Sequence, residues 1–230
     1  MQDHHSENLS RAASLTGETG FVIVGAGGFG RGVADIVRDT AQRYGHTFLG
    51  AFDDGEVDRH LLERLHIPFL GYSDNARELP SGTRFVVPIS NAGARRTLDA
   101  KLREYGLEPF ALIDNDTSIG TGVEIGPGAI VCAGTRARPN AHLGAHVHLN
   151  GNVSVGHDAV IDAYSSVFPL SAIGGFAHLE EDVTIGAVSA INPSVTIGRG
   201  AYIGSGAAVV SDVPAHTLAA GVPAKVKKTI

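Results

Sequence analysis

The pattern of apolar residues changes its period near residue 113. Before that point, short apolar runs alternate with segments whose apolar residues have helical spacing. This alternation predicts a parallel sheet covered by helices. We therefore expect an α/β domain over residues 21–112. Its predicted strands are residues 21–24, 47–52, 84–89 and 109–113, and its predicted helices are residues 30–44 and 92–105.

From Ile113 onward the chain follows a strict six-residue period. Residues 113–214 divide into 17 hexads without insertion, and the first position is Ile, Val or Leu in 16 of them. The fifth position is Ser, Thr, Ala or Val in every hexad. A chain that turns a corner every six residues closes a triangle in 18, and stacked coils then pair as parallel strands about 4.8 Å apart. We expect a prism with the first and fifth positions inward and with second-position glycines at positive φ.

Composition and charge narrow the classes of partner and compartment. A formal charge of −6 without a run of Lys or Arg argues against nucleic acid as a partner. The single cysteine, Cys132, excludes an internal disulfide, and no ligand spacing of His, Cys or acids predicts a metal site. No stretch of apolar residues is long enough to predict a membrane span, so we expect a soluble, cytoplasmic protein. Residues 1–20 are expected to form a disordered tail and residues 215–230 a C-terminal tail.

Histidine is the side chain best suited to acid–base chemistry near neutral pH. The hexads contain five histidines, none at an inward position, so all are expected to face outward. They are His142, His146, His148, His157 and His178. His157 stands out because Asp158 follows it, and a carboxylate can orient an imidazole and support its charge; a surface turn without function is the alternative. Gly175 lies one coil later, where its amide could stabilise an oxyanion.

A glycine-rich segment follows the first predicted strand. Gly25 to Gly30 fits the pattern G-x-G-x-x-G between a strand and a helix, a context in which backbone amides receive phosphate. NAD binding is disfavoured, because about 90 residues precede the prism and no second catalytic domain follows. Arg31 and Arg95 are either partners of a diphosphate or charges on a helix surface.

The hexads, the closing sequence GVPAK at Gly221–Lys225 and the opening FVIVGAGGFGRGVADIV resemble the hexapeptide-repeat acyltransferases. The combination is similar to the subgroup of sialic acid O-acetyltransferases and nucleotide-amino-sugar N-acetyltransferases. The resemblance implies a Rossmann-like nucleotide-sugar-binding domain at residues 21–112 and a left-handed parallel β-helix acyltransferase domain at residues 113–214. It also implies acetyl-CoA as co-substrate and a homotrimer with active sites between neighbouring prisms.

The resemblance assigns roles to individual residues. His157 becomes the general base and Asp158 its helper, where the family often has Glu, and Asn150 matches an asparagine seven residues before the histidine. The residues expected to contact the acyl donor are Ser166, where some members have His, with Gly175, Ala187 and Ser205. Those expected to contact the nucleotide sugar are Gly27, Gly28, Phe29, Asp53, Asp54, Ser90 and Asn91. Phe29 stands where the family often has His, which leaves the acceptor open. Lys225, Lys227 and Lys228 either meet CoA phosphates or form a solvated basic tail.

The leading hypothesis is an acetyl-CoA-dependent acetyltransferase that acts on a sugar, with N-acetylation of a nucleotide-linked amino sugar as its specific form. The position of Cys132 away from His157 argues against a covalent acyl-cysteine. Two alternatives stay open. One is a non-catalytic sugar-nucleotide-binding or scaffold protein, and the other is an acyltransferase with a non-sugar amine or hydroxyl acceptor.

Overall fold

The computed structural model describes residues 5–14 and 20–230 of the 230-residue chain. The chain divides into two compact units between Leu112 and Ile113. No helix in these described ranges is long and apolar enough to cross a lipid bilayer.

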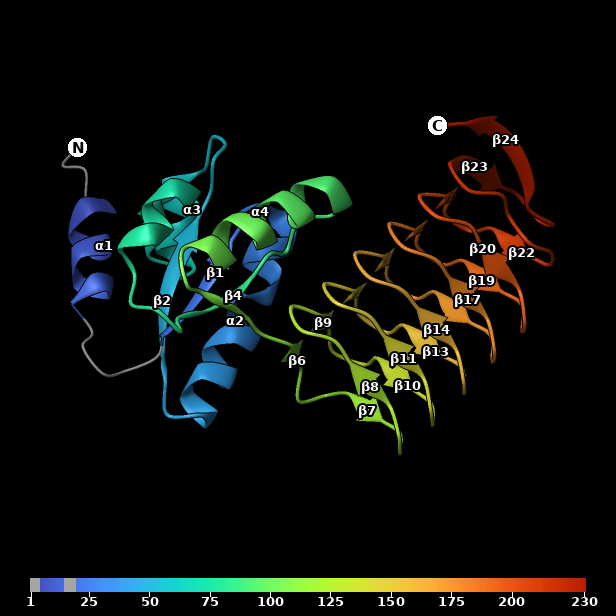
Figure 1. The fold of residues 1–230 in the computed structure, drawn as a ribbon, viewed down its shortest axis with the longest axis horizontal. Coiled ribbons are helices and arrows are strands. Elements are labelled where there is room, and N and C mark those ends of the chain that lie inside the picture. The colour runs from blue at the N-terminus through green and yellow to red at the C-terminus, as the bar shows by residue number, and fades with distance from the viewer. Residues whose placement is uncertain (1–4, 15–19) are drawn as a thin grey trace. The chain divides into compact units, whose positions relative to one another are not determined.

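The first unit is built on a parallel sheet (Figure 1). Its strand order is β3 (Phe69–Gly71), β2 (Thr47–Phe52), β1 (Gly20–Val24), β4 (Arg84–Val86) and β5 (Glu108–Pro109). Helix α2 (Gly28–Arg43) follows β1 and helix α4 (Ala92–Glu104) follows β4. Because the order reverses between β1 and β4 and crossovers are right-handed, these helices cover opposite faces of the sheet. Two short elements flank β3, namely α3 (Arg59–Arg64) and the 3₁₀ helix η1 (Ser73–Glu78).

The strands and helices expected before residue 106 are found, but the strand expected at 84–89 ends already at Val86. The expected strand at 109–113 is wrong. Glu108–Pro109 is the last strand of the first sheet, whereas Leu112–Ile113 is β6, the first strand of the second unit. The chain passes from one sheet to the other between them: the Phe110 amide still donates to Phe85, and the Asp114 amide already donates to Val131. The apolar run at residues 109–113 therefore contributes strands to two different sheets.

An N-terminal helix, α1 (His5–Ala13), corrects part of the expected disordered tail at residues 1–20. Leu9 and Ala12 lie three residues apart on one helix face and are buried in the core of the first unit. The Asn8 side chain donates to the carbonyl of Phe69 in β3 at 3.3 Å. An apolar face this short does not stand out in a polar sequence, which is why the expectation fails. For residues 1–4 and 15–19 the expectation lies outside the described residues.

The second unit is a triangular β-helix whose walls are stacks of parallel two-residue strands (Figure 1). Wall 1 consists of β7 (Ser118–Ile119), β10 (Arg136–Ala137), β13 (Ser154–Val155), β16 (Ala172–Ile173), β19 (Ala190–Ile191) and β22 (Ala208–Val209). Wall 2 consists of β8 (Glu124–Ile125), β11 (His142–Leu143), β14 (Val160–Ile161), β17 (His178–Leu179) and β20 (Thr196–Ile197). Wall 3 begins with β6 and continues through β9 (Ile130–Val131), β12 (His148–Leu149), β15 (Ser166–Val167), β18 (Thr184–Ile185) and β21 (Tyr202–Ile203).

Each strand in these walls pairs with the strand one coil, or 18 residues, later. Arg136 pairs with Ser154 on wall 1, and His142 pairs with Val160 on wall 2. The first and fifth positions of the central hexads are buried and form one continuous aliphatic core. Buried fifth-position serines satisfy their hydroxyls within the prism, as Ser165 does by donating to the carbonyl of Glu180 at 2.9 Å. The predicted fold class, an α/β domain followed by a parallel β-helix, is confirmed.

The expected position of the positive-φ residues is wrong. The fourth hexad residue takes this conformation, as at Asn140 (φ 60°) and Asp158 (φ 57°), whereas the second-position glycines do not. The second position needs glycine for a different reason, because the backbone of the next coil passes directly over it. A Cβ added at Gly144 would lie 2.6 Å from the backbone nitrogen of Ala163.

The prism extends beyond residue 214, which corrects the expected C-terminal tail. Strand β23 (Thr217–Ala220) pairs in parallel with β21 and adds to wall 3, and β24 (Lys225–Thr229) returns antiparallel to β23. The buried side chains of Thr217 and Ala219 alternate along β23, a period of two that the hexad count does not detect.

The close approach of successive coils generates a prediction about stability. Replacement of Gly144 by Ala forces the Ala163 backbone to move and should lower the free energy of unfolding by about 1–3 kcal/mol. Gly151→Ala is the matched control, because a Cβ there meets nothing nearer than the Ala133 carbonyl at 3.7 Å. Urea unfolding followed by circular dichroism measures both. Equal midpoints for the two variants would contradict this account of the second position.

Candidate active site

His157 and Asp158 occupy a turn on the outside of the prism, directly after strand β13 of wall 1. We call the turns that follow wall 1 the His157 edge; they include Pro139–Asn140, His157–Asp158 and Gly175–Phe176. The Nδ1 atom of His157 lies 2.8 Å from Oδ2 of Asp158, and the imidazole is 60% exposed. The turn itself is fixed by the Asp158 amide, which donates to the carbonyl of Pro139 one coil earlier. The first two residues of the predicted catalytic set are therefore brought together.

The protonation of this pair follows from the carboxylate. The hydrogen bond from His157 lowers the pKa of the Asp158 carboxyl below its ordinary value. Partial desolvation opposes this shift, and a hydrogen bond from Asn140 adds to it. Asp158 is then ionised at neutral pH and can only accept hydrogen bonds. Nδ1 of His157 must carry the proton, so Nε2 of the neutral ring keeps its lone pair. This arrangement leaves Nε2 able to accept a proton.

Gly175 lies beside the free nitrogen of this ring, as the 18-residue stacking predicts. A Cβ added at Gly175 would lie 2.8 Å from Nε2 of His157, so the absence of a side chain leaves the space next to this nitrogen open. In the described part of the chain, the Gly175 amide donates no hydrogen bond to another coil, whereas the amides of Gly174 and Phe176 do. Phe176 borders the same space, with its ring edge-on to His157 at a centroid distance of 5.1 Å.

Two of the five prism histidines are buried, although neither occupies an inward hexad position. His146 is fully buried and stacks on Tyr164 one coil later, with ring centroids 5.2 Å apart and nearly parallel planes. His148 is buried on wall 3 beside Ser166. His142 and His178 lie on wall 2, where they pair with Glu124 and Asp162. Among the described residues, no three His, Cys, Asp or Glu side chains gather as a metal site.

The other predicted prism residues lie on a different edge. Asn150, Ala187 and Ser205 belong to the turns that follow wall 3, which we call the Ala187 edge. Ala187 and Ser205 stand one above the other, because the Gly206 amide donates to the carbonyl of Ala187. The Asn150 side chain donates to the carbonyl of Val167 at 3.2 Å and so braces its own edge. Within one chain, these residues do not meet His157.

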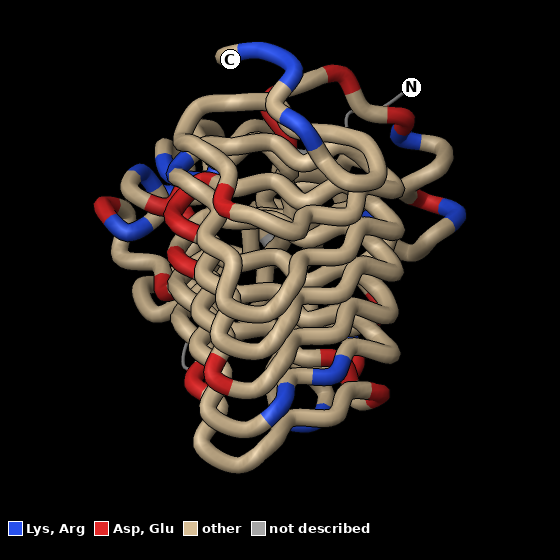
Figure 2. Tube along the Cα trace, turned by 90° about the vertical axis from the view of Figure 1, so that its right-hand side faces the viewer, with Lys and Arg blue, Asp and Glu red and all other residues tan. Residues whose placement is uncertain are grey.

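Three further prism positions have distinct surroundings. Ser166 lies on β15 and is only 2% exposed. Burial raises the pKa of the Cys132 thiol to about 12, so this cysteine stays protonated at neutral pH. Lys225 is exposed at the start of β24, and Figure 2 shows Lys and Arg residues at this C-terminal end of the prism.

In the first unit, the glycine-rich segment joins β1 to the start of α2. Gly30 is required by packing, since a Cβ there would lie 1.8 Å from the carbonyl oxygen of Gly25. Gly27 and Gly28 are exposed, and a Cβ at either would meet nothing within 4 Å. Gly27 is the N-cap of a 16-residue helix without an acidic residue in its first turn. The unblocked amides and the helix dipole make this terminus suitable for an anion.

A cavity of about 350 Å³ opens at the carboxyl ends of the parallel strands, where the strand order reverses. Val24, Ile89 and Leu98 give it an apolar lining, and Thr97 of α4 contributes a hydroxyl. The expected acidic pair, Asp53 and Asp54, lies at its wall. An apolar pocket with a few polar groups at its wall is typical of a small-molecule site.

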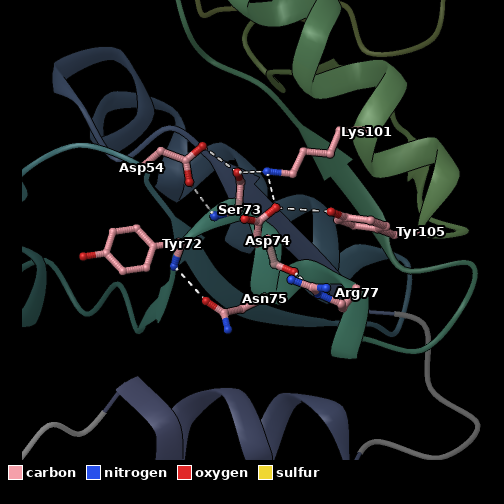
Figure 3. A network of polar contacts seen from close by, with 8 residues as sticks. All are labelled: Asp54, Tyr72, Ser73, Asp74, Asn75, Arg77, Lys101 and Tyr105. Atoms are coloured by element: carbon pink, nitrogen blue, oxygen red, sulfur yellow. Dashed lines mark hydrogen bonds and ion pairs between the residues drawn. The ribbon is translucent and has the colours of Figure 1, made fainter.

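The two acids are held by different parts of the unit. Asp53 accepts hydrogen bonds from the amides of Ala26 (2.6 Å) and Gly55 (2.7 Å), so it braces the glycine-rich segment. Asp54 accepts from the amide and hydroxyl of the buried Ser73. Lys101 of α4 donates to the Ser73 hydroxyl at 2.8 Å (Figure 3). Because an ammonium can only donate, the Ser73 proton must point to Asp54.

This network continues to the surface at Asp74 (Figure 3). Lys101 approaches the Asp74 carboxylate at 2.7 Å, and the hydroxyl of Tyr105 donates to it at 3.3 Å. The hydrogen bond and charge of Lys101 lower the pKa of the Asp74 carboxyl. Helix α4 is thereby tied to η1 and, through Ser73, to the cavity.

Several of the remaining residues expected at the nucleotide site form hydrogen bonds within the protein. Arg95 is fully buried and donates to the carbonyls of Ile89 and Ser90, which corrects its interpretation as a diphosphate partner. Asn91 caps α4 by accepting from the Ala94 amide at 2.8 Å. Arg31 donates to the carbonyl of Ala26 at 3.0 Å, and Phe29 is half-buried in the first turn of α2.

Sequence reasoning missed several residues that shape these sites. Ser73 and Lys101 lie outside any motif, and only the fold brings them to Asp54. Asn140 could have been found, because it lies one full coil before Asp158, and its side chain donates to Oδ1 of that residue at 3.3 Å. Phe176 could also have been found, because it directly follows Gly175, which the 18-residue register places beside His157.

Family models match parts of both units. The model of the PglD N-terminal domain matches residues 21–102, and the model of the bacterial transferase hexapeptide (six repeats) matches residues 176–210. A segment of 36 residues is 64% identical to 2,3,4,5-tetrahydropyridine-2,6-dicarboxylate N-acetyltransferase of Enterococcus faecalis. That segment spans only 16% of this chain and 16% of the curated relative.

Solved structures are similar to nearly the whole chain. A variant of perosamine N-acetyltransferase from Caulobacter crescentus, in complex with CoA and GDP-perosamine, gives a TM-score of 0.82 at 28% identity, over 91% of this chain and 97% of that one. WeeI from Acinetobacter baumannii gives 0.81 at 28% identity, over 91% and 100%. The acetyltransferase domain of PglB from Neisseria gonorrhoeae, in complex with acetyl coenzyme A, gives 0.80 at 27% identity, over 92% and 100%.

The two family models thus fall on the two units described above, and the fold of both is shared with these acetyltransferases. The chain therefore combines a segment that matches the PglD N-terminal domain with bacterial transferase hexapeptide repeats, and it shares its fold with solved acetyltransferases.

Proposed function

We propose that the chain is an acetyl-CoA-dependent N-acetyltransferase whose acceptor is a nucleotide-linked amino sugar. The observation that carries the proposal is the orientation of His157, whose Nδ1 is held by Asp158 while Nε2 faces the open space beside Gly175. The similar structures support the choice of substrates, because the Caulobacter enzyme was solved with CoA and GDP-perosamine and the PglB domain with acetyl coenzyme A.

The proposed reaction is a direct transfer with His157 as general base. Acetyl-CoA supplies the acetyl group, and CoA thiolate is the leaving group. Nε2 of His157 accepts a proton from the acceptor amine as its nitrogen attacks the thioester carbonyl. The Gly175 amide donates to the carbonyl oxygen as negative charge develops there. The imidazolium then returns its proton to the departing thiolate, so one N–C bond forms, one C–S bond breaks and the ring ends neutral.

A covalent route through the cysteine is disfavoured. Cys132 lies on the Ala187 edge rather than beside His157, and its thiol is protonated at neutral pH because burial raises its pKa. A protonated thiol is a poor nucleophile, and His157 does not contact it to activate it.

The first unit is proposed to bind the nucleotide part of the acceptor. The phosphates would lie at the N-terminus of α2, on the exposed amides near Gly27 and Gly28. The nucleoside would occupy the 350 Å³ cavity, with its base against the apolar lining and its hydroxyls donating to Asp53 and Asp54. Each carboxylate oxygen that accepts one hydrogen bond from the protein still has a lone pair for such a donor.

We infer further that the active site forms between two copies of a homotrimer. The base lies on the His157 edge, whereas Asn150, Ala187 and Ser205 lie on the Ala187 edge of the same prism. A convex edge cannot surround a substrate, but packing the His157 edge of one copy against the Ala187 edge of the next would create a crevice that contains both sets of residues.

Replacement of the base tests the proposed reaction. His157→Ala should lower kcat by about 10²–10⁴-fold, measured as CoA thiol release with UDP-, GDP- and dTDP-linked amino sugars. Free sialic acid and small amines complete the panel and distinguish other acceptors. His142→Ala, which removes another exposed prism histidine, should leave turnover unchanged. Near-normal turnover of His157→Ala would remove this residue from the mechanism.

Obstruction of the cavity tests the assignment of the first unit. Thr97→Trp places an indole in the cavity and should weaken binding of the nucleotide sugar at least ~10-fold. Acetyl-CoA affinity should not change, because the prism is untouched. Isothermal titration measures both, with Ala100→Trp as the control on an exposed position of the same helix that does not line the cavity. Equal nucleotide-sugar affinities for the two variants would place the nucleotide elsewhere.

Mixed assemblies test the shared site. His157→Ala and Ala187→Trp chains should each form inactive trimers of about 71 kDa, three times the chain mass of 23.8 kDa. In any mixed ring of three, one junction joins an intact His157 edge to an intact Ala187 edge. Doubly tagged mixed trimers should therefore recover about one third of wild-type turnover. A monomer by light scattering, or inactive mixed trimers, would refute the arrangement.

A further inference from the structure

We propose that Asn140 is a positioning residue for the general base: its amide fixes the Asp158 carboxylate and, through it, the ring of His157. This inference rests on the proposed function for its catalytic consequence, but its structural content is independent of substrate. Asn140 Nδ2 lies 3.3 Å from Oδ1 of Asp158, and Asp158 Oδ2 lies 2.8 Å from Nδ1 of His157. The three side chains form one directed chain of hydrogen bonds.

The direction of this chain follows from the middle member. An ionised carboxylate only accepts, so the group of Asn140 that faces it must be the NH₂ and the nitrogen of His157 that faces it must carry a proton. Each carboxylate oxygen is thus assigned to one partner. Without Asn140, the carboxylate would be held on one side only and would rotate about its χ2 torsion, which is broad for Asp.

Backbone geometry places Asn140 at this site without a special loop. It is the fourth residue of its hexad, lies one coil below Asp158, and shares the positive φ that this position takes from Gly122 to Gly206 (60° for Asn140 and 57° for Asp158). The 18-residue register therefore stacks the two residues, with the Asn140 side chain reaching up the edge. Asparagine tolerates this backbone conformation better than most residues and also carries a donor.

Restraint of the carboxylate matters because His157 is largely exposed. The imidazole is 60% accessible, and the contacts that orient it are Asp158 and the edge of Phe176. A short Asp fixes a neighbouring ring only when its own torsion is fixed. The hydrogen bond from one coil below supplies that restraint, and it also contributes to the lowered pKa of the carboxyl.

The fold itself supplies variants that separate this role from turn formation. Glycine occupies the same hexad position at Gly122, Gly128 and Gly134, so Asn140→Gly keeps the backbone and removes only the donor. Asn140→Asp keeps the shape but replaces the donor with an acceptor that repels Asp158. Asn152→Gly is the matched control, because Asn152 has the same φ of 60° on the Ala187 edge.

The first measurement is the tautomer of His157, read from its ring ¹⁵N shifts by NMR and assigned by its loss in His157→Gln. The wild type should show the Nδ1–H form, which leaves Nε2 unprotonated. Asn140→Gly and Asn140→Asp should both shift the ring toward a mixture of tautomers, whereas Asn152→Gly should not. An unchanged tautomer in both Asn140 variants would overturn the proposal, and this result needs no substrate.

The second measurement is kinetic. Asn140→Gly should lower kcat about 3- to 10-fold, the weight of one hydrogen bond, with KM for both substrates unchanged. In an Asp158→Asn background, the same substitution should cause no further loss, because Asn140 acts only through Asp158. An undiminished kcat, normal activity of Asn140→Asp, or a full additional loss in the double variant would each contradict the proposal. Inactivity of the wild type with every acceptor would instead refute the proposed function.

Discussion

The register of the coils is the constraint on which the prism and its chemistry depend. Amides of one strand donate to carbonyls of the coil above, as Arg136 does to Val153 at 2.9 Å and Ser154 to Ser171 at 3.0 Å. Successive side chains in a strand point to opposite faces, so a slip of one residue would expose the aliphatic core. The same register that buries the core therefore decides which polar residues stand above one another on the outside.

That constraint confines the proposed catalytic and positioning groups to the edges. The walls are flat and their outward residues lie in straight rows, whereas the third and fourth hexad residues project at the turns. His157, Asp158 and Asn140 all use these two positions, in two successive coils of one edge. A rigid, convex edge holds such groups in fixed geometry but excludes no water by itself. This is the physical reason why we propose that a second edge, from another copy, completes the site.

The sequence predicts the prism well because each hexad repeats the same steric demand. Ile, Val or Leu at the first position and small residues at the fifth identify the inward rows, and counting by 18 along the sequence is enough to place Gly175 beside His157. The period does not say what lies beyond an outward side chain, so it cannot predict the burial of His146 and His148. The period also does not distinguish a glycine that is needed for a positive φ from a glycine, such as Gly144, that lies directly under the backbone of the next coil.

In the first unit, prediction fails where partners come from distant segments. Asp53 and Asp54 are adjacent and look equivalent in the sequence, but neighbouring residues at a strand end point to opposite sides. Asp53 consequently braces the glycine-rich segment, and Asp54 is held through Ser73 by Lys101, which lies much further along the chain. Lys101 becomes a partner only because α4 folds back over η1. No local pattern identifies it.

The fixed acids also order the crevice that they border. Both carboxylates are held before any ligand arrives, so little side-chain entropy is lost when a donor binds to them. Carboxyl oxygens that accept hydrogen bonds next to an apolar lining favour neutral donors over phosphate, whereas the N-terminus of α2 attracts phosphate. In the proposed function, these opposite electrostatic preferences would give an elongated ligand a single orientation. The proposed nucleotide sugar, with a hydroxyl-bearing nucleoside and an anionic diphosphate, would satisfy both preferences at once.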